Sequence, residues 1–550
     1  MSVFQAAFIA LFYAFARSAF NAGLGGYILS QPLVAGTIAG LLLGDPIAGA
    51  ALGGMINLGT LALTNLRLRV GPDVALIGYV GVSVMLLGGV KVDIPSGTGS
   101  ASAATIFAAL AVLGIVVNFM RGVVNSVLAH WADYFADRGD ANIVAFINIV
   151  PTQLWLFLIS FFPAFLVLRL DVKMLLDITT TIPHWVQSAL NLSQYLLAAL
   201  GIALSLRLIM QGSSIAYFIL GWLGAQLFGL APVTLLGAAI AMIHAFLARK
   251  RMESSHETLI SDLLPSDQAD NINPDAPRLT GNDLRLSLLL WVFFHDAGLN
   301  FERAQNMGFA TAIAPIAARL YSDAHERAAC LRRHLTMFAT EFSMGALIVG
   351  ATAAMEERRA AGDVISDAEF VGAKTGLMAG LGLTGDAVVG GAITAIGIAV
   401  GVALARQQTL LGPFLFIVVE SALVLGIAWA GFRLGYRTFI NLEAWARAND
   451  WLRAGLFGAV RLGAFMLGAL VISSVPVQLP AAAIIQIDLA RIPLQAVLLD
   501  GIMLRMMPLT ITLALWWLVK YQRANPMLLL GMIILVSVIA CGLLSLIGWL

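Results

Sequence analysis

Apolar runs of the length of a membrane-spanning helix recur along most of the chain. In the first part of the chain they cover about 4–27, 73–92, 101–129, 141–168, 189–206 and 213–248. In the second part they lie near 371–384, 387–407, 410–431, 456–475, 494–518 and 527–550. A helix needs about 20 mostly apolar residues to cross the hydrocarbon core of a bilayer. The pattern predicts an all-α membrane protein, a polytopic helical bundle built in two halves.

A polar segment separates the two halves. Residues 249–285 are rich in charged residues, contain proline, and have no apolar face wide enough to bury. Three consecutive basic residues at the start of this segment directly follow a long apolar run, and basic residues concentrate on the cytoplasmic side of membranes. We therefore expect a cytoplasmic linker between a membrane domain at 1–248 and a second one at 286–550. A chance basic cluster is the alternative.

The second half opens with charged stretches that still have a helical pattern, over about 286–370. Charged residues at this density suit amphipathic helices at the cytoplasmic surface better than membrane spans. The membrane-spanning part of the second half is therefore expected to begin after them.

Two glycine-rich apolar segments, one in each half, are expected to form broken or re-entrant helices. The first, 31–65, is interrupted at Gly44, and the second, 371–401, is interrupted near Asp386. Paired interruptions in two halves of a membrane protein point to a substrate site, because exposed backbone groups are tolerated only beside a cavity or inside protein. Tight helix packing through small residues is an alternative explanation, and the two are compatible.

Composition excludes several other classes of protein. With 60% hydrophobic and 11% charged residues, the chain is not a soluble multi-domain protein. Lys+Arg 32 against Asp+Glu 31 give a formal net charge of +1, so no strong field attracts nucleic acid. Two cysteines and seven scattered histidines lack metal-ligand spacing, and no phosphate-binding, hydrolase or dinucleotide motif is present. We expect no cofactor, no metal, no nucleic-acid partner and no catalytic residue.

Charged residues inside apolar runs are the best candidates for a site, since a charge in hydrocarbon costs roughly 2.5–3.5 kcal/mol. Lys374 and Asp386 frame the second glycine-rich segment and have the strongest claim. Glu420 lies inside another apolar run and is either an internal partner of Arg207 or a proton site. For Arg17, an internal ion pair or an interfacial position is the simpler explanation.

Short motifs in and after the first glycine-rich segment carry a family resemblance. They are Pro32-Leu33, Gly44-Asp45, Gly53-Gly54 and Pro72-Asp73. In this order they resemble the membrane component C (IIC) of mannose-family phosphotransferase-system (PTS) permeases. The resemblance continues weakly to about residue 248.

The start of the second half carries a longer signature. It consists of Asn300, Phe301, Glu302, Arg303, Gln305, Gly308 and Phe309. This stretch resembles component D (IID) of the same family, and later motifs keep their order and spacing. Because C and D are usually separate polypeptides that pair, the resemblance implies a fusion of the two, natural or engineered, through the 249–285 linker.

The resemblance implies a permease of the bacterial plasma (inner) membrane that lies in lipid and transports a sugar or a sugar derivative. A separate IIB protein, itself charged by a IIA protein, would phosphorylate the sugar at the cytoplasmic side. The chain has neither an A nor a B domain, so the resemblance implies that any phosphohistidine lies on another protein. It also implies homo-oligomers, as trimers of C/D pairs.

Several positions depart from the family pattern. The family commonly has acidic residues where this chain has Gly25 and Asn57, and an asparagine where it has Arg207. The usual glutamine of a Phe-Asn-Thr-Gln-Pro motif in component D is Glu341 here. Because carboxylates and amides normally hold neutral sugars, the exchanges lead to the hypothesis of an anionic or modified sugar.

These considerations define the candidate substrate-binding residues. They are Asn57, Asn65, Arg207, Glu341, Lys374, Thr384 and Asp386. The two asparagines are expected to offer amides, Lys374 and Asp386 to act as a charged pair, and Glu341 to accept a sugar hydroxyl.

Two other functions remain open on the same fold. One is a secondary transporter uncoupled from phosphorylation, with Glu420 or Asp386 as the proton site. The other is a receptor or scaffold that does not transport. A requirement for a IIB protein separates the permease from the uncoupled transporter, and the absence of any saturable ligand would favour the scaffold.

Overall fold

The computed structural model describes most of the chain. The described residues are 1–25, 28–65, 72–89, 101–170, 183–209, 214–228, 276–440 and parts of 461–546. The predicted linker lies outside this set up to residue 275, so its expected cytoplasmic position stays a prediction.

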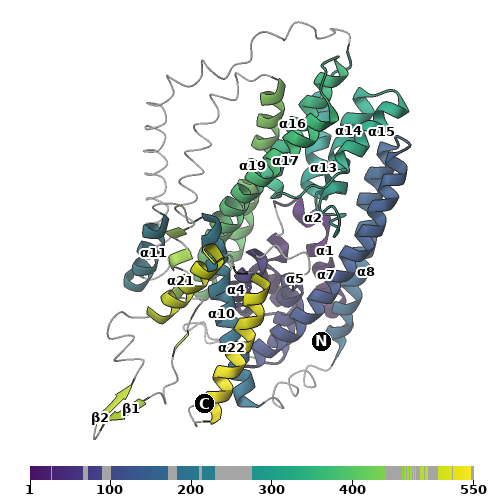
Figure 1. Cartoon of the computed structure of the whole chain (residues 1–550). Coiled ribbons are helices and arrows are strands. Elements are labelled where there is room, and N and C mark those ends of the chain that lie inside the picture. Colours follow the sequence, from purple (N-terminus) through teal and green to yellow (C-terminus); the bar gives the residue numbers. More distant parts are fainter. Residues whose placement is uncertain are drawn as a thin grey trace.

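The first half is a helical bundle in which short helices pack beside two long ones (Figure 1). Its elements are α1 Val3–Arg17, α2 Ala19–Ala22, η1 Ile28–Ser30, α3 Pro32–Leu43, α4 Pro46–Asn65, α5 Val74–Leu76, η2 Ile77–Gly81, α6 Val82–Leu87, α7 Ala101–Ala136, α8 Ala141–Arg169, α10 His184–Ile209 and α11 Ser214–Phe228. The long helices α7 and α8 follow each other through a short turn and lie side by side.

The second half is also helical. Its elements are α13 Gly281–Phe294, α14 Asn306–Leu320, α15 Ala324–His334, α16 Phe342–Ala360, α17 Asp367–Gly385, η4 Asp386–Thr394, α18 Ala395–Arg406, α19 Leu411–Ile440, β1 Ile484–Ile487, β2 Ala490–Pro493, α21 Met506–Lys520 and α22 Pro526–Leu546. The strands pair antiparallel, with Ile485 opposite Ile492. Within the described residues, this small hairpin is the exception to the predicted all-helical membrane fold.

Four described helices are long and apolar enough to cross a membrane by length and composition. They are Ala109–Ala136, Ala141–Arg169, Val388–Arg406 and Leu411–Arg437. Each half contributes two of them, which agrees with the predicted arrangement of a membrane protein in two halves.

The first glycine-rich segment is a tight helical hairpin of α3 and α4. Gly44 makes the turn with a φ of 93°, a conformation that favours glycine. A Cβ on Gly36 would lie 2.5 Å from the carbonyl oxygen of Gly49, so the helix backbones touch. With 12 residues, α3 is about 18 Å long, too short to cross a hydrocarbon core of about 30 Å. The predicted interruption and the predicted close packing are both present.

The second glycine-rich segment differs from the expected broken helix. The helices α17 and α18 are joined without a gap by η4, a π-helix that begins at Asp386. The backbone hydrogen bonds here join residues five apart instead of four, so the chain stays helical. Single π-helical turns inside longer helices are often found at functional sites.

The charged opening of the second half folds into packed helices. α14 buries almost all its residues, and α16 is buried along most of its length. α15 keeps an amphipathic character, since Cys330 and Leu331 are buried whereas Arg332 is exposed. Placement of these helices on the cytoplasmic side stays a prediction.

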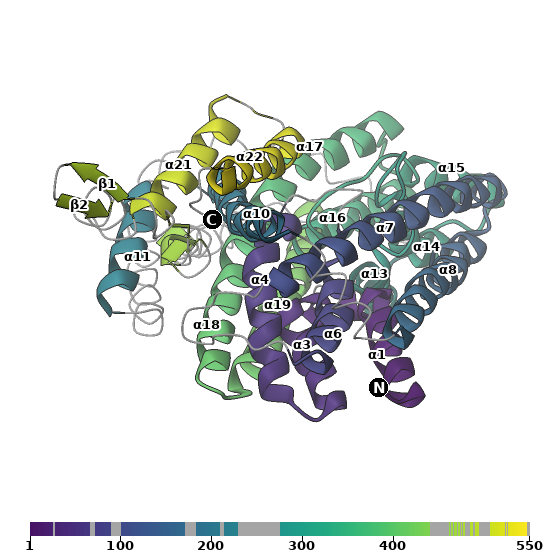
Figure 2. The same ribbon diagram turned by 90° about the horizontal axis from the view of Figure 1, so that it is seen from below.

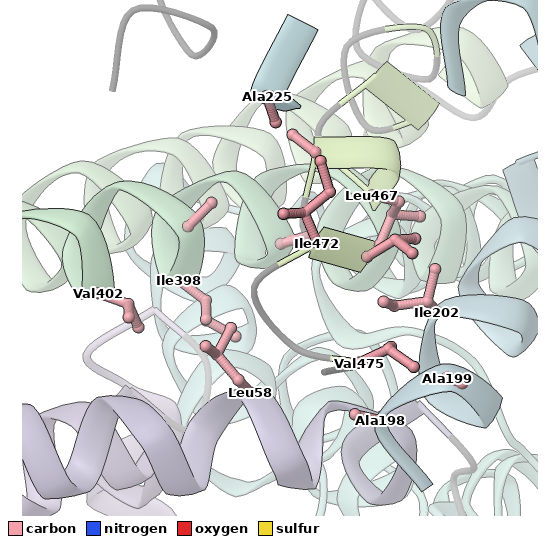
Figure 3. Packing of buried hydrophobic residues seen from close by; sticks show 14 of the residues in the cluster. Leu58, Ala198, Ala199, Ile202, Ala225, Ile398, Val402, Leu467, Ile472 and Val475 are labelled. Carbon is pink, nitrogen blue, oxygen red and sulfur yellow. The ribbon is translucent and has the colours of Figure 1, made fainter. Parts of the chain in front are cut away.

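The two halves share hydrophobic cores. One core combines Leu128 and Val144 of α7 and α8 with Met307 and Ala310 of α14. In a second core, Leu58 of α4 packs with residues of α10 and α18 (Figure 3). Seen from below, α3 and α4 run beside α18 and α19, so the two glycine-rich segments are neighbours (Figure 2).

Candidate functional site

Asn57 holds the start of α3 from the neighbouring helix α4. Its Oδ1 accepts a hydrogen bond from the Leu33 amide at 3.0 Å, and its Nδ2 donates to Gln31 Oε1 at 3.1 Å. Gln31 is the N-cap residue of α3 but makes no side-chain cap. Asn57 therefore supplies the missing cap from another helix, a structural task that its position in the sequence did not indicate.

Glu341 caps the start of α16 and is 3% exposed. Its carboxylate accepts hydrogen bonds from the amides of Ser343 and Met344, both at 3.0 Å, and from Ser343 Oγ at 2.5 Å. A carboxylate has about four acceptor positions, so one remains after these three bonds. A negative charge is also favourable at the N-terminus of a helix.

The end of α17 lies against this cap. A Cβ on Gly385 would lie 2.6 Å from Glu341 Cβ, and a Cβ on Gly382 would lie 3.6 Å from Thr340 Oγ1. Glycine at these two positions lets α17 approach the start of α16. The structure thus brings Glu341 against Gly385, the residue before Asp386, which begins η4 and has a half-buried side chain.

Thr340 belongs to this group although sequence reasoning did not select it. It is 3% exposed, and within the described residues its Oγ1 has no hydrogen-bond partner. Gln305 fixes its backbone, donating from Nε2 to the Thr340 carbonyl and accepting from the Thr340 amide at 2.9 Å. Thr340 lies in the segment 338–342, which departs from the Phe-Asn-Thr-Gln-Pro motif of component D, and this departure could have marked it as a candidate.

Lys374 lies apart from Asp386. Its Nζ donates to Thr336 Oγ1 at 2.7 Å and to the Arg333 carbonyl at 3.3 Å, and it lies 4.9 Å from the centre of the Phe309 ring. Twelve residues of continuous helix separate it from Asp386, about 18 Å along the axis. The expected charged pair is therefore not formed, because α17 does not fold back at its glycines.

The remaining predicted residues are placed as follows. Arg207 is exposed near the C-terminal end of α10. Glu420 is buried in α19 and accepts a hydrogen bond from Thr394 rather than from Arg207. Asn65 and Thr384 belong to α4 and α17, but their side chains lie outside the described residues.

A buried ion cluster joins α14, α15 and α16. Glu356, fully buried, accepts from Arg333 Nε at 2.9 Å and from Tyr321 at 2.6 Å, and lies 2.7 Å from His334 Nε2. Burial opposes ionisation, but the His334 hydrogen bond and the nearby Arg333 lower the pKa of Glu356 to about 2. Burial lowers the pKa of His334 to about 4 despite the neighbouring carboxylate. Glu356 on α16 meets Arg333 and His334 of α15, and Tyr321 follows α14, so no local sequence motif revealed the cluster.

Cys330 also approaches this cluster. Potential ligand atoms of Cys330, His334 and Glu356 lie within 4.8 Å of one another. Both oxygens of Glu356 already accept hydrogen bonds from Arg333, His334 or Tyr321. A second cation beside the guanidinium would be repelled, so the cluster is explained as an ion pair with its hydrogen bonds.

The IID-type signature contacts the first half directly. Arg303 donates to both oxygens of Asp133 on α7, at 2.8 and 2.6 Å. Phe301 packs over Gly122 of α7 and lies 5.9 Å from the Phe119 ring. The signature therefore forms part of the interface between the halves.

Within the first half, Arg17 forms the expected internal ion pair. Its Nη1 lies 2.6 Å from Asp73 Oδ2, and Tyr13 donates to the same oxygen at 2.6 Å. Asp73 also accepts from the amides of Ala75 and Leu76 at the start of α5. The Pro72-Asp73 motif thus ties α1 to α5.

Comparison with known proteins identifies both halves. Residues 278–547 match the family described as PTS system mannose/fructose/sorbose family IID component. Residues 3–243 match the PTS system sorbose-specific IIC component.

Individual proteins similar to each half carry the same component names. The mannose-specific EIID component of Escherichia coli (strain K12) is 33% identical over 275 residues, 49% of this chain and 96% of the relative. The mannose-specific EIIC component of the same strain is 25% identical over 235 residues, 42% of this chain and 85% of the relative. A chain in a cryo-electron microscopy structure of the mannose transporter ManYZ with microcin E492 is 31% identical, covers 48% of this chain and 98% of its own length, and has a TM-score of 0.30. The chain therefore belongs to the mannose/fructose/sorbose family of PTS sugar permeases, with a IIC component and a IID component fused in one polypeptide.

Proposed function

We propose that this sugar permease works together with a separate IIB protein, charged by a IIA protein, which phosphorylates the sugar at the cytoplasmic side. Residues 1–248 and 286–550 act as its two membrane domains, and 249–285 as a cytoplasmic linker. The permease resides in the bacterial inner membrane and assembles as trimers. The family relationship supports these assignments, because IIC and IID are components of such systems.

The observation that carries the site is the meeting of Glu341 with the start of the π-helix at Asp386. The Glu341 side chain lies against Gly385 at the end of α17, and the helix changes its hydrogen-bonding pattern at the next residue, Asp386. Carboxylates that accept sugar hydroxyls, with a helix geometry that exposes backbone groups, suit a polyhydroxylated ligand. Thr384 belongs to the same turn of α17, and its part in sugar binding stays a prediction from the sequence.

The charges of this group favour a neutral sugar over an anionic one. The hypothesis of an anionic ligand relied on the exchanges at Gly25 and Asn57 and on the added cation Arg207, and Arg207 is exposed at the end of α10. Lys374 is engaged by Thr336 and the Arg333 carbonyl, about 18 Å along α17 from Asp386. Asn57 acts indirectly by fixing α3, and Asn65 lies further along the same helix, α4.

The test is uptake of labelled mannose, fructose and sorbose into vesicles that contain the full chain, with and without phosphorylated IIB. We expect phosphorylated sugar to accumulate only when IIB is present. Accumulation of unmodified sugar without IIB, driven by a proton gradient, would show the uncoupled transporter instead. The absence of saturable binding of any of the three sugars would favour the scaffold.

A further inference from the structure

Glu420 is a buried acid inside a membrane-spanning helix. It lies within Leu411–Arg437, a stretch of α19 long and apolar enough to cross a membrane, yet its side chain is only 7% exposed. Its Oε1 accepts a hydrogen bond from Thr394 Oγ1 at 2.7 Å. In the described part of the chain, Oε2 is buried and has no hydrogen-bond partner.

Among the described residues, neither protonation state of Glu420 satisfies both carboxyl oxygens. An ionised carboxylate in a membrane span needs a cation or several donors, and in the part of the chain that is described Glu420 has one neutral donor, Thr394. A protonated carboxyl can donate from Oε1 to Thr394 Oγ1, but within the described residues Oε2 still has no donor. A hydroxylated ligand would relieve either state, because a sugar hydroxyl both donates and accepts.

Arg207 and Lys374 do not pair with Glu420. Arg207 is exposed at the end of α10. Lys374 donates to Thr336 and to the Arg333 carbonyl. Glu420 is therefore not explained as half of an internal ion pair with either of them.

The surroundings of Glu420 combine parts of both halves. Gly25 of the first half has a φ of 106°, and a Cβ there would lie 2.6 Å from Cα of Ser421, the residue after Glu420. On α18, a Cβ on Gly397 would lie 3.6 Å from Glu420 Oε2. Thr394, the hydrogen-bond partner, is the last residue of η4. Glu420 thus lies where the end of the π-helix and the turn after α2 approach α19.

We propose that Glu420 is a sugar-contacting residue whose Oε2 exchanges hydrogen bonds with a hydroxyl of a neutral sugar, and that Thr394 positions its carboxyl group. Asp386 is the first residue of η4, and Glu420 contacts its last residue, Thr394. The proposal rests on the proposed sugar site and adds to it a carboxyl group from α19, a helix that does not contribute to the Glu341 group.

The test measures sugar binding directly, so that it does not depend on IIB. The full chain in lipid nanodiscs is titrated with mannose, fructose and sorbose, and infrared difference spectra record carboxyl bands that change on binding. We expect a sugar-induced carboxyl signal in the wild-type protein that is absent from Glu420→Gln. The apparent affinity should fall about tenfold in this variant, as for the loss of one good hydrogen bond.

Further variants separate contact from folding. Thr394→Val keeps the shape of the side chain and should weaken binding less than Glu420→Gln, with an altered carboxyl band. Glu420→Asp keeps the acid and should retain part of the signal. Asp363→Asn, which changes a surface carboxylate paired with Arg358 at 2.7 Å, should bind as the wild type does. Thermal unfolding of each variant confirms that it is folded.

Three results would overturn the proposal. The first is a folded Glu420→Gln variant that binds sugar with wild-type affinity. The second is a Glu420 carboxyl signal that follows pH but not sugar, which would assign the residue to proton binding. If the wild-type protein responds to none of the three sugars, the proposed sugar site itself fails, and this is evident before any variant is compared.

Discussion

Arg303 of the second half holds Asp133 of the first half through two parallel hydrogen bonds, at 2.8 and 2.6 Å. Asn125, on the same helix as Asp133, donates to the carbonyl oxygens of Ala297 and Leu299. His130 lies 3.2 Å from Glu302. A bidentate pair fixes orientation as well as distance. The IID-type signature is therefore a docking element, and its contacts do not depend on the covalent linker.

The first prediction concerns separated halves. Co-expressed fragments 1–260 and 275–550 should remain associated in mild detergent, because the shared cores and the Arg303–Asp133 pair connect residues outside the linker. Arg303→Asp or Asp133→Arg alone should weaken the association about tenfold, since each places like charges together. The measurement is co-purification of one tagged fragment with the other.

The reversed pair is the control for this experiment. In the double variant Arg303→Asp with Asp133→Arg, opposite charges face each other again, so much of the association should return. Fragments of the unaltered sequence that separate in mild detergent, or a double variant weaker than both single ones, would contradict the role assigned to the pair.

The second prediction is that the protein loses stability at low pH because His334 and Glu356 become protonated. The pKa of His334 falls from 6.5 to about 4 on folding, so the unfolded chain binds the proton more readily between these values. The pKa of Glu356 falls from 4.5 to about 2, which has the same sign. Stability should therefore decrease as the pH falls from about 6.5 towards 2. Thermal unfolding in detergent at pH 7, 6 and 5 measures the upper part of this range.

Substitutions in the cluster separate the two contributions. His334→Asn cannot titrate, so the dependence on pH between about 6.5 and 4 should become flatter. Glu356→Gln removes the buried charge partner of Arg333 and leaves it with Asp367 at the surface, 2.5 Å from Nη1, so it should cost about 3–5 kcal/mol. Asp363→Asn at the surface should change stability by less than about 1 kcal/mol. A pH dependence that is unaltered in His334→Asn would show that other groups cause it.

The third prediction compares two glycines in helices. Gly36→Ala should destabilise the protein by about 1–3 kcal/mol, because its Cβ would lie 2.5 Å from the Gly49 carbonyl oxygen and force α3 away from α4. Gly372→Ala in α17 meets nothing within 4 Å and should stabilise the protein by up to about 1 kcal/mol through helix propensity. Thermal unfolding of the two variants checks this. Equal effects would mean that close packing is not why Gly36 is glycine.

The sequence predicted the two-half helical architecture because apolar length and polar separation are local properties. The interruption predicted in the first glycine-rich segment is present at Gly44. It failed at Asp386 and Lys374, because residues that frame a segment in sequence meet only if the chain turns back between them. The helix continues as a π-helix instead. Asn57 was predicted as a substrate-binding amide and this stays a prediction, whereas its hydrogen bond to the Leu33 amide on another helix was not evident from spacing.

The Glu356 cluster shows a second limit of sequence reasoning. Arg333 and Glu356 lie in stretches that read as amphipathic surface helices, since their charges are numerous. Folding buries Arg333 on α15 and Glu356 on α16 and pairs them at 2.9 Å, while Arg332 stays exposed. Which charge turns inward depends on the packing of α14, α15 and α16, and this is a tertiary property.

The last prediction concerns Glu341, which has both a structural task and a proposed one. Glu341→Gln keeps the size of the side chain but presents an amide group where the carboxylate now accepts three hydrogen bonds. The lost cap should lower stability by about 1 kcal/mol. Loss of the carboxylate should raise the apparent KM for the transported sugar about tenfold, as for the loss of one hydrogen bond to a charged group. Ser343→Ala removes one cap contact, the Ser343 Oγ bond, but keeps the carboxylate, so it should lower stability with little change in KM. If both variants change stability and KM in the same proportion, Glu341 acts only as a helix cap, and the sugar contacts must come from Thr340 and Asp386.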